Sequence, residues 1–119
     1  MSIERYESNG RFCQAVSYNG MLFVSGLVDI ETSTFEEQTK GVFAKIDALL
    51  EKYGSSRAHL LNASVYLKSV ENVAEFNALW LEWIIAGEEP TRTCIVTEMV
   101  HPAILVEISV VAAIVPHKR

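Results

Sequence analysis

Two charged residues in the C-terminal part of the chain have types and positions that suit chemistry. Arg92 opens a run of strand-forming residues, and Glu107 interrupts the apolar stretch "AILVEISVVAAIV". A guanidinium can hold a carboxylate through two parallel hydrogen bonds, and a carboxylate can hold or deprotonate a water molecule. Charged residues near strand ends are mostly solvated, so these two residues by themselves favour a salt bridge or a solvated strand end.

The first half of the chain predicts a hairpin followed by a helix. The segment "FCQAVSYNGMLFVSGLV" has two β-rich runs around Asn19-Gly20, a pair favoured in type I′ turns. The segment 32–56 carries one apolar stripe at helical spacing. Ser33 or Thr34 is expected to cap this helix, and Gly54 is expected to stop it.

The second half predicts a strand, a helix and two further strands. A strand is expected in "LLNASVYLK", and a helix is expected from a cap at Ser69 to a stop at Gly87. The last two strands are expected near residues 93–99 and 105–115. The order β-β-α-β-α-β-β predicts one α+β domain over residues 1–119, with both helices on one face of a sheet.

The predicted sheet is apolar on both of its faces. In the last strand the even positions are wholly apolar, and the odd positions are mostly apolar apart from Glu107 and Ser109. Two helices cannot cover both faces, so another copy of the chain is the simplest cover, and Glu107 would be buried by assembly. The hairpin's second strand repeats the pattern, with Met21, Phe23 and Leu27 assigned to one side and Leu22, Val24 and Val28 to the other.

Regular alternation places Arg92 and Cys94 on the same side of their strand. If the two final strands pair, Arg92 and Glu107 approach one cavity. The sequence alone does not fix whether these strands pair or which of their residues are opposite each other.

Composition and charge exclude several classes of protein. The net charge is −5 and no basic block is present, which argues against a nucleic-acid partner. The N-terminal segment has no apolar signal core, and no apolar run is long enough to cross a bilayer. Cys13 and Cys94 match no metal or redox spacing and are expected to be free thiols of a cytoplasmic protein. The histidines are dispersed, so no metal site is expected.

Several motifs together resemble the RidA family, also called the YjgF family. They are "VSG" after the hairpin, "VYLKSVENVAEFNALWLEWI", "PTR-C" and "LVEI". Arg92 stands in a P-x-R-x-C setting fifteen residues before Glu107 of V-E-I, and the likeness is greatest to a shorter-loop, YoaB-like branch. The resemblance implies a chorismate-mutase-like fold, a homotrimer and clefts between subunits.

The resemblance also implies an activity, which is hydrolysis of reactive enamines and imines such as 2-aminoacrylate to a 2-keto acid and ammonia. No cofactor is implied, and the expected partners are a small imine or keto-acid carboxylate and two further copies of the chain. By position, Arg92 matches the family's carboxylate-binding arginine and Glu107 matches the glutamate that positions water. The implied substrate-binding residues of the cleft are Phe12, Ser25, Gly26, Asn77 and Cys94.

One position departs from the family pattern. This chain reads "GRFCQ", with Phe12 where the archetype has a tyrosine, so the ring is kept and the hydroxyl is lost. Because of this departure, the alternative that the protein is a non-catalytic module that binds small carboxylates stays open. Ribonuclease activity or translation inhibition, also attributed to the family, is disfavoured by the acidic charge.

The smaller candidates have structural alternatives as well. Ser25 can hydrogen-bond the backbone, and Asn77 can cap or pin its helix. Cys94 can be a small buried hydrophobe, and Trp80 and Trp83 suit packing better than ligand binding.

Overall fold

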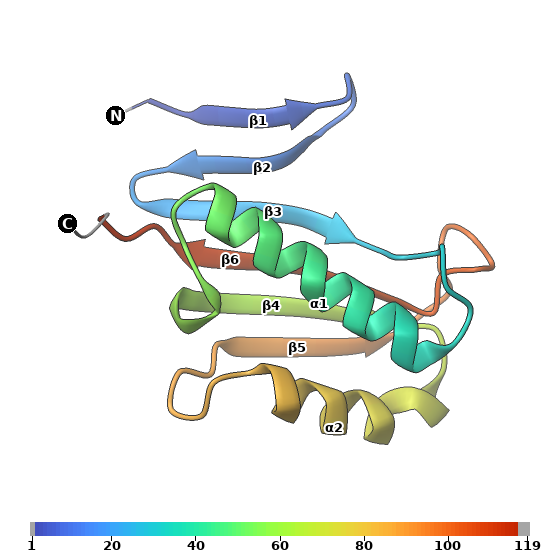
Figure 1. Ribbon diagram of the computed structural model, residues 1–119. Coiled ribbons are helices and arrows are strands. Elements are labelled where there is room, and N and C mark those ends of the chain that lie inside the picture. Colours follow the sequence, from blue (N-terminus) through green and yellow to red (C-terminus); the bar gives the residue numbers. More distant parts are fainter. Residues whose placement is uncertain (1, 117–119) are drawn as a thin grey trace.

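A computed structural model of the chain describes residues 2–116, which form one mixed sheet and two α-helices (Figure 1). The sheet has the order β1-β2-β3-β6-β4-β5. Both α-helices follow strands and return the chain to the sheet, as the α+β prediction requires. The bounds are β1 Glu4–Ser8, β2 Cys13–Tyr18, β3 Met21–Leu27, α1 Phe35–Lys52, β4 Leu60–Leu67, α2 Val73–Trp83, β5 Thr91–Val96 and β6 Val106–Ala113, with short 3-10 helices at Arg57–His59 and Val70–Asn72.

Local sequence signals place the hairpin turn and the first helix correctly. Asn19 and Gly20 have φ values of 54° and 80°, as a type I′ turn between β2 and β3 requires. Thr34 caps α1 by accepting a hydrogen bond from the Glu37 N–H at 3.1 Å, and Gly54 follows the helix with a φ of 90°.

The second helix is shorter than predicted. Ser69 caps a 3-10 turn through the Glu71 N–H at 3.1 Å, and α2 then runs only to Trp83. The backbone is already extended at Ile84, so the predicted stop at Gly87 is wrong and Gly87 lies in the following turn with a φ of 89°.

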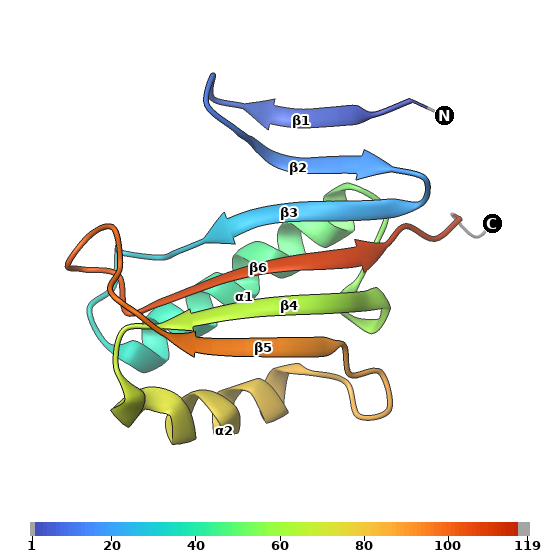
Figure 2. The same ribbon diagram turned by 180° about the vertical axis from the view of Figure 1, so that it is seen from behind.

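The two last strands do not pair with each other. β4 lies between them, antiparallel to β6 and parallel to β5 (Figure 2). The segment β4–α2–β5 is a strand–helix–strand unit, and such crossovers join parallel strands. The condition under which Arg92 and Glu107 would approach one cavity within the chain is therefore not met.

Helix α1 crosses one face of the sheet over β3, β6 and β4 (Figure 1). The even positions of β6 are buried on this side, as predicted, and its odd positions lie on the other side. This second side of the sheet, here called the open face, carries large apolar side chains. Phe23 on β3 is 42% exposed and Ile95 on β5 is 46% exposed. Apolar surface of this kind marks an interaction site more often than a solvated surface.

The assignment of Leu27 to the side of Met21 and Phe23 is wrong. The pairing of β3 with β6 shifts register between Val24 and Leu27, and Leu27 is buried in the core. A bulge puts an extra residue between two core positions, so the alternation restarts on the same side. Ser25 and Gly26 occupy that bulge.

Aromatic rings join the two helices on the covered face. Phe43 on α1 stacks on Trp83 of α2 with ring centroids 4.3 Å apart, and Trp80 and Phe76 pack beside them. Trp80 and Trp83 are buried, so the prediction that they are packing residues is confirmed.

The edge strand β1 was not predicted, because its exposed residues show no apolar alternation. Side-chain contacts attach it to the end of α1. Tyr6 stacks on Tyr53 with centroids 4.2 Å apart, and Lys52 donates to the Glu7 carboxylate at 2.9 Å. The hydrogen bond from Tyr53 and that from Lys52 lower the pKa of Glu7, so this contact is retained in mildly acidic solution.

Candidate functional site

The predicted site residues lie in two groups on opposite faces of the sheet. Arg92 pairs with Ala63 of β4, whose side chain is buried under the helices, so Arg92 projects from the helix-covered face. Glu107 pairs with Tyr66 of β4 and projects from the open face. The two charged residues are separated by β4 as well as by the sheet itself.

The first group, here called the arginine cluster, consists of Arg92, Asn77 and Cys94. Arg92 Nη2 donates to Asn77 Oδ1 at 2.9 Å, which joins the edge strand β5 to α2. Cys94 follows on the same face of β5 and is exposed, so it is not a buried hydrophobe within the single chain. Asn77 pins Arg92 rather than capping α2.

Aromatic rings hold the guanidinium of Arg92 from the helix side. Its Cζ lies 5.1 Å from the centroid of Trp80 and 5.6 Å from that of Phe76. Contacts of this kind orient a guanidinium without neutralising its charge. Within residues 2–116 no carboxylate forms an ion pair with Arg92, so its charge is available to an anion.

The second group surrounds Glu107 on the open face. Glu107 and Gly26 line a cavity of about 260 Å³ together with Tyr66, Ser109 and the segment from Thr97 to Val100. Glu98, in that segment, is a second carboxylate of the same cavity. This set is here called the glutamate pocket. Among the described residues, none makes a hydrogen bond or ion pair with the Glu107 carboxylate.

Gly26 is required by the position of Glu107. A Cβ built on Gly26 would lie 2.1 Å from Glu107 Oε2, much closer than real Cβ contacts. The bulge in β3 therefore brings bare backbone against the carboxylate. Any larger residue at position 26 has to displace Glu107.

Ser25 and Phe12 are not among the residues that line the glutamate pocket. Ser25 Oγ donates to the Cys13 carbonyl oxygen at 2.6 Å, so the backbone-bonded alternative describes this serine. Phe12 precedes β2 and is 51% exposed. It lines a separate cavity of about 510 Å³ that extends to Lys45 and Leu49 of α1, and Gly26 borders both cavities.

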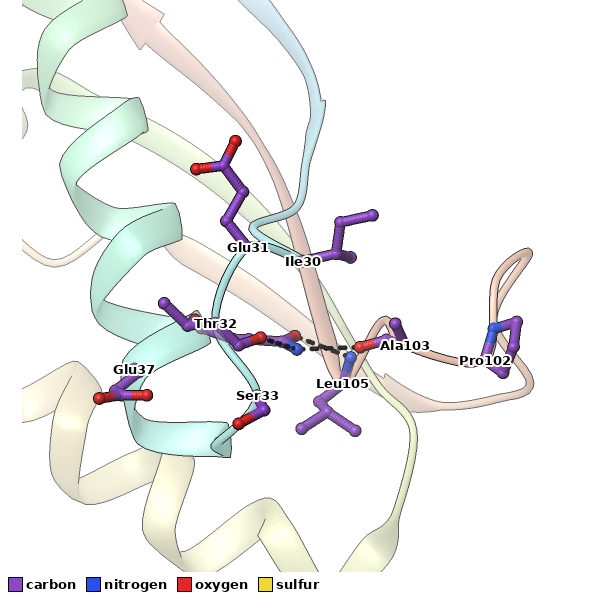
Figure 3. A pocket seen from close by; sticks show the side chains of 9 residues that line it. Ile30, Glu31, Thr32, Ser33, Glu37, Pro102, Ala103 and Leu105 are labelled. Atoms are coloured by element: carbon purple, nitrogen blue, oxygen red, sulfur yellow. Dashed lines mark hydrogen bonds between the residues drawn. The ribbon is translucent and has the colours of Figure 1, made fainter.

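The chain just before β6 is held by a residue that sequence reasoning missed, at the pocket drawn in Figure 3, which is separate from the glutamate pocket. Gln38 Nε2 donates to the carbonyl oxygens of Thr32 and Ala103 at 3.0 and 2.9 Å, and the Leu105 N–H donates to Gln38 Oε1 at 3.0 Å (Figure 3). Gln38 is buried and precedes Val42 by one helical turn. In the sequence, Gln38 could have been noticed as a polar residue in line with the apolar stripe of α1. In the structure, its hydrogen bonds fix the chain just before Glu107.

Among residues 2–116, therefore, Arg92 is a cation without an ion-pair partner on one face and Glu107 is a carboxylate without one on the other. The sheet lies between these two groups, so a small substrate cannot contact both of them on a single chain. Within residues 2–116 no group of three or more histidine, cysteine, aspartate or glutamate side chains is placed to hold a metal ion. Among these residues, no helix has the length and apolar character needed to cross a membrane.

Comparisons with known proteins cover nearly the whole chain. A family model described as Endoribonuclease L-PSP matches residues 2–114. The RutC family protein YoaB of Escherichia coli K12 is 33% identical over 114 residues, covering 96% of this chain and 100% of that protein. A RutC family protein of Haemophilus ducreyi is 33% identical over 113 residues, covering 94% and 97%.

Solved structures agree with the fold. The crystal structure of NMB1025 from Neisseria meningitidis, described as a member of the YjgF protein family, matches with a TM-score of 0.94 and 37% identity over 98% of both chains. A Salmonella typhimurium protein, conjecturally described as a translation initiation inhibitor, matches with a TM-score of 0.85 and 35% identity over 95% of this chain and 98% of that one.

Proposed function

The chain belongs to the RidA/YjgF family, and on this premise we propose that it hydrolyses reactive enamines and imines at a site built from two copies of itself. The substrate class is the 2-imino acid, such as the imine form of 2-aminoacrylate. The reaction takes one 2-iminium acid and one water to one 2-keto acid and one ammonium ion. No redox partner, metal or bound cofactor is needed for this balance.

The observation that carries the proposal is the pair of unneutralised charges. Arg92 has a guanidinium held on its aromatic side and unpaired with any carboxylate of the described residues. It suits the substrate carboxylate, which it can meet with two parallel hydrogen bonds. Glu107 suits the attacking water, whose proton it can accept, and its negative charge favours the cationic iminium.

We propose that Gly26 and the peptide groups beside Cys94 border the bound substrate in the assembled site. Phe12 and Asn77 complete this site, Phe12 by its ring and Asn77 by holding Arg92 in place. Ser25 then contributes through its backbone, because its hydroxyl proton is already donated to Cys13. The free thiols of Cys13 and Cys94 suit a reducing compartment, so we place this activity in the cytoplasm.

The chain is expected to be a homotrimer of about three times 13.3 kDa. The apolar open face of the sheet needs a cover, and a closed ring of three copies can supply one to every chain. Light scattering at micromolar concentration measures the mass directly. A stable monomer would contradict the prediction, and it would leave Arg92 and Glu107 on surfaces that never meet.

The deaminase reaction is tested with 2-aminoacrylate generated from serine by a pyridoxal-phosphate-dependent dehydratase. We expect the protein to accelerate ammonia release above the spontaneous rate. If it binds pyruvate but leaves that rate unchanged, it is a non-catalytic carboxylate-binding module, the alternative that Phe12 keeps open. Salt-dependent RNA binding by highly purified protein would instead support the endoribonuclease description of the family.

Phe12→Tyr is expected to raise the rate on small imines, by at most about tenfold for each 1.4 kcal/mol of transition-state stabilisation. The ring already borders the cavity next to Gly26, and the substitution adds only a hydroxyl donor. The measurement is kcat/KM for 2-aminoacrylate, with the trimer mass checked for both proteins. An unchanged or lower rate in an intact protein would mean that the phenylalanine ring has its own role.

A further inference from the structure

Tyr66 has no role in any of the assignments made from sequence, yet it lies directly beside Glu107. The two residues are paired across β4 and β6, and their side chains leave the sheet on the same open face. Residues directly opposite in an antiparallel pair have Cβ atoms about 4.5–5.5 Å apart. Tyr66 also lines the glutamate pocket together with Gly26 and Glu107.

Tyr66 differs from Tyr6 and Tyr53, whose hydroxyl groups make hydrogen bonds in the described structure. Tyr6 hydrogen-bonds Ser17, and Tyr53 hydrogen-bonds Glu7. Tyr66 is partly buried, and within residues 2–116 its hydroxyl has no hydrogen-bond partner. The Tyr66 hydroxyl is not one of the fully buried unpaired atoms of the described residues, so it is open to a water molecule in the pocket that it shares with the unpaired Glu107 carboxylate.

We propose that the Tyr66 hydroxyl is the second protein partner of the water molecule that Glu107 activates. This inference rests on the proposed deaminase function and adds a residue to it. The water molecule then has two protein partners: Glu107 accepts one of its protons, and the Tyr66 phenol O–H donates a hydrogen bond to its oxygen. Two partners on neighbouring strands fix the direction of attack better than one flexible carboxylate can.

The phenol keeps its proton throughout the reaction. The water oxygen forms a bond to the iminium carbon while the C=N π pair moves to nitrogen, and Glu107 takes the water proton. The Tyr66 O–H then donates to the oxygen of the carbinolamine. Glu107 returns its proton to the nitrogen, which leaves as ammonia while the oxygen forms the keto group and gives its own proton to the Glu107 carboxylate. The departing ammonia takes that proton from Glu107 and becomes the ammonium ion, so Glu107 is again a free carboxylate.

The test is Tyr66→Phe, which removes only the hydroxyl, compared with Tyr18→Phe as a matched control. Tyr18 lies at the end of β2 and is not among the residues that line the glutamate pocket. Each protein is assayed for kcat on 2-aminoacrylate, for pyruvate affinity by calorimetry, and for trimer mass and Tm. We expect Tyr66→Phe to lower kcat about tenfold while pyruvate affinity stays within about twofold, because the phenol acts on water and not on the carboxylate.

Each outcome separates this inference from the proposed function. A parent protein that releases ammonia, with Tyr66→Phe slower and Tyr18→Phe unchanged, supports both. A parent that releases ammonia and a Tyr66→Phe variant with the same kcat overturns the role of Tyr66 and leaves the deaminase function standing. A variant that loses kcat, pyruvate affinity and trimer together shows a packing role and also overturns the inference. A parent with no activity overturns the deaminase function, and the role of Tyr66 with it.

Discussion

Arg92→Ala is expected to weaken pyruvate binding and imine turnover together, by about 30-fold or more. Removing one partner of a charge-assisted, desolvated pair costs roughly 2–5 kcal/mol, and tenfold corresponds to about 1.4 kcal/mol. The aromatic rings of Trp80 and Phe76 hold the guanidinium in place before a ligand arrives, so little of its binding energy is spent on orientation. Calorimetry with pyruvate and ammonia release from 2-aminoacrylate measure the two effects.

Arg92→Lys tests whether geometry or charge matters at this position. An ammonium group keeps the charge but cannot reproduce the two parallel hydrogen bonds, so the rescue is expected to be poor. Arg5→Ala, an equal loss of charge on the exposed edge strand β1, serves as the control and is expected to bind like the parent. If Arg92→Ala binds and turns over like the parent, Arg92 is only a structural charge joined to Asn77.

Glu107→Gln is expected to keep much of the pyruvate affinity and to lose turnover by about a hundredfold or more. A positioned general base contributes roughly 10²–10⁴-fold, and an amide can hold a water molecule but cannot take its proton. The comparison of kcat with pyruvate affinity separates loss of chemistry from loss of binding. A fully active Glu107→Gln protein would make Glu107 a structural carboxylate and would favour the non-catalytic binding module.

Two further variants test whether Glu107 or Glu98 is the carboxylate that turnover requires. Glu98→Gln makes the same change of charge in the same pocket and is expected to affect turnover far less than Glu107→Gln. Gly26→Ala leaves Glu107 chemically intact but puts a methyl group 2.1 Å from Oε2, so it is expected to lower turnover by displacing the carboxylate. If Gly26→Ala is fully active while the trimer is intact, the observed position of Glu107 is not the one that reaction requires.

Much of the local structure could be predicted from sequence because its causes are local. The Asn19-Gly20 turn and the Thr34 cap depend on a few neighbouring residues, and both are found where the sequence places them. The apolar even positions of β6 lie under α1, since alternation fixes which side chains share a face. The strand β1 was missed, because an exposed edge strand carries no apolar alternation to detect.

The candidate site was predicted residue by residue but not in space. The resemblance selected Arg92 and Glu107, and the alternation of each strand placed Cys94 with Arg92. Neither the resemblance nor the alternation revealed that Arg92 and Glu107 lie on opposite faces of the sheet, because alternation relates only residues of the same strand. Gln38 and Tyr66 were missed since their importance arises from residues far away in the sequence, Ala103 and Glu107 respectively.

By itself the sequence determined the kinds of elements from β2 onward, their order, the covered face of β6 and the apolar character of the open face. Only the tertiary structure decided that β4 separates β5 from β6, and that the bulge at Ser25 and Gly26 turns Leu27 into the core. The physical reason is that strand order and register depend on packing summed over the whole sheet and its helices. Pairing distant strands is a non-local choice, and no spacing of residues along one segment records it.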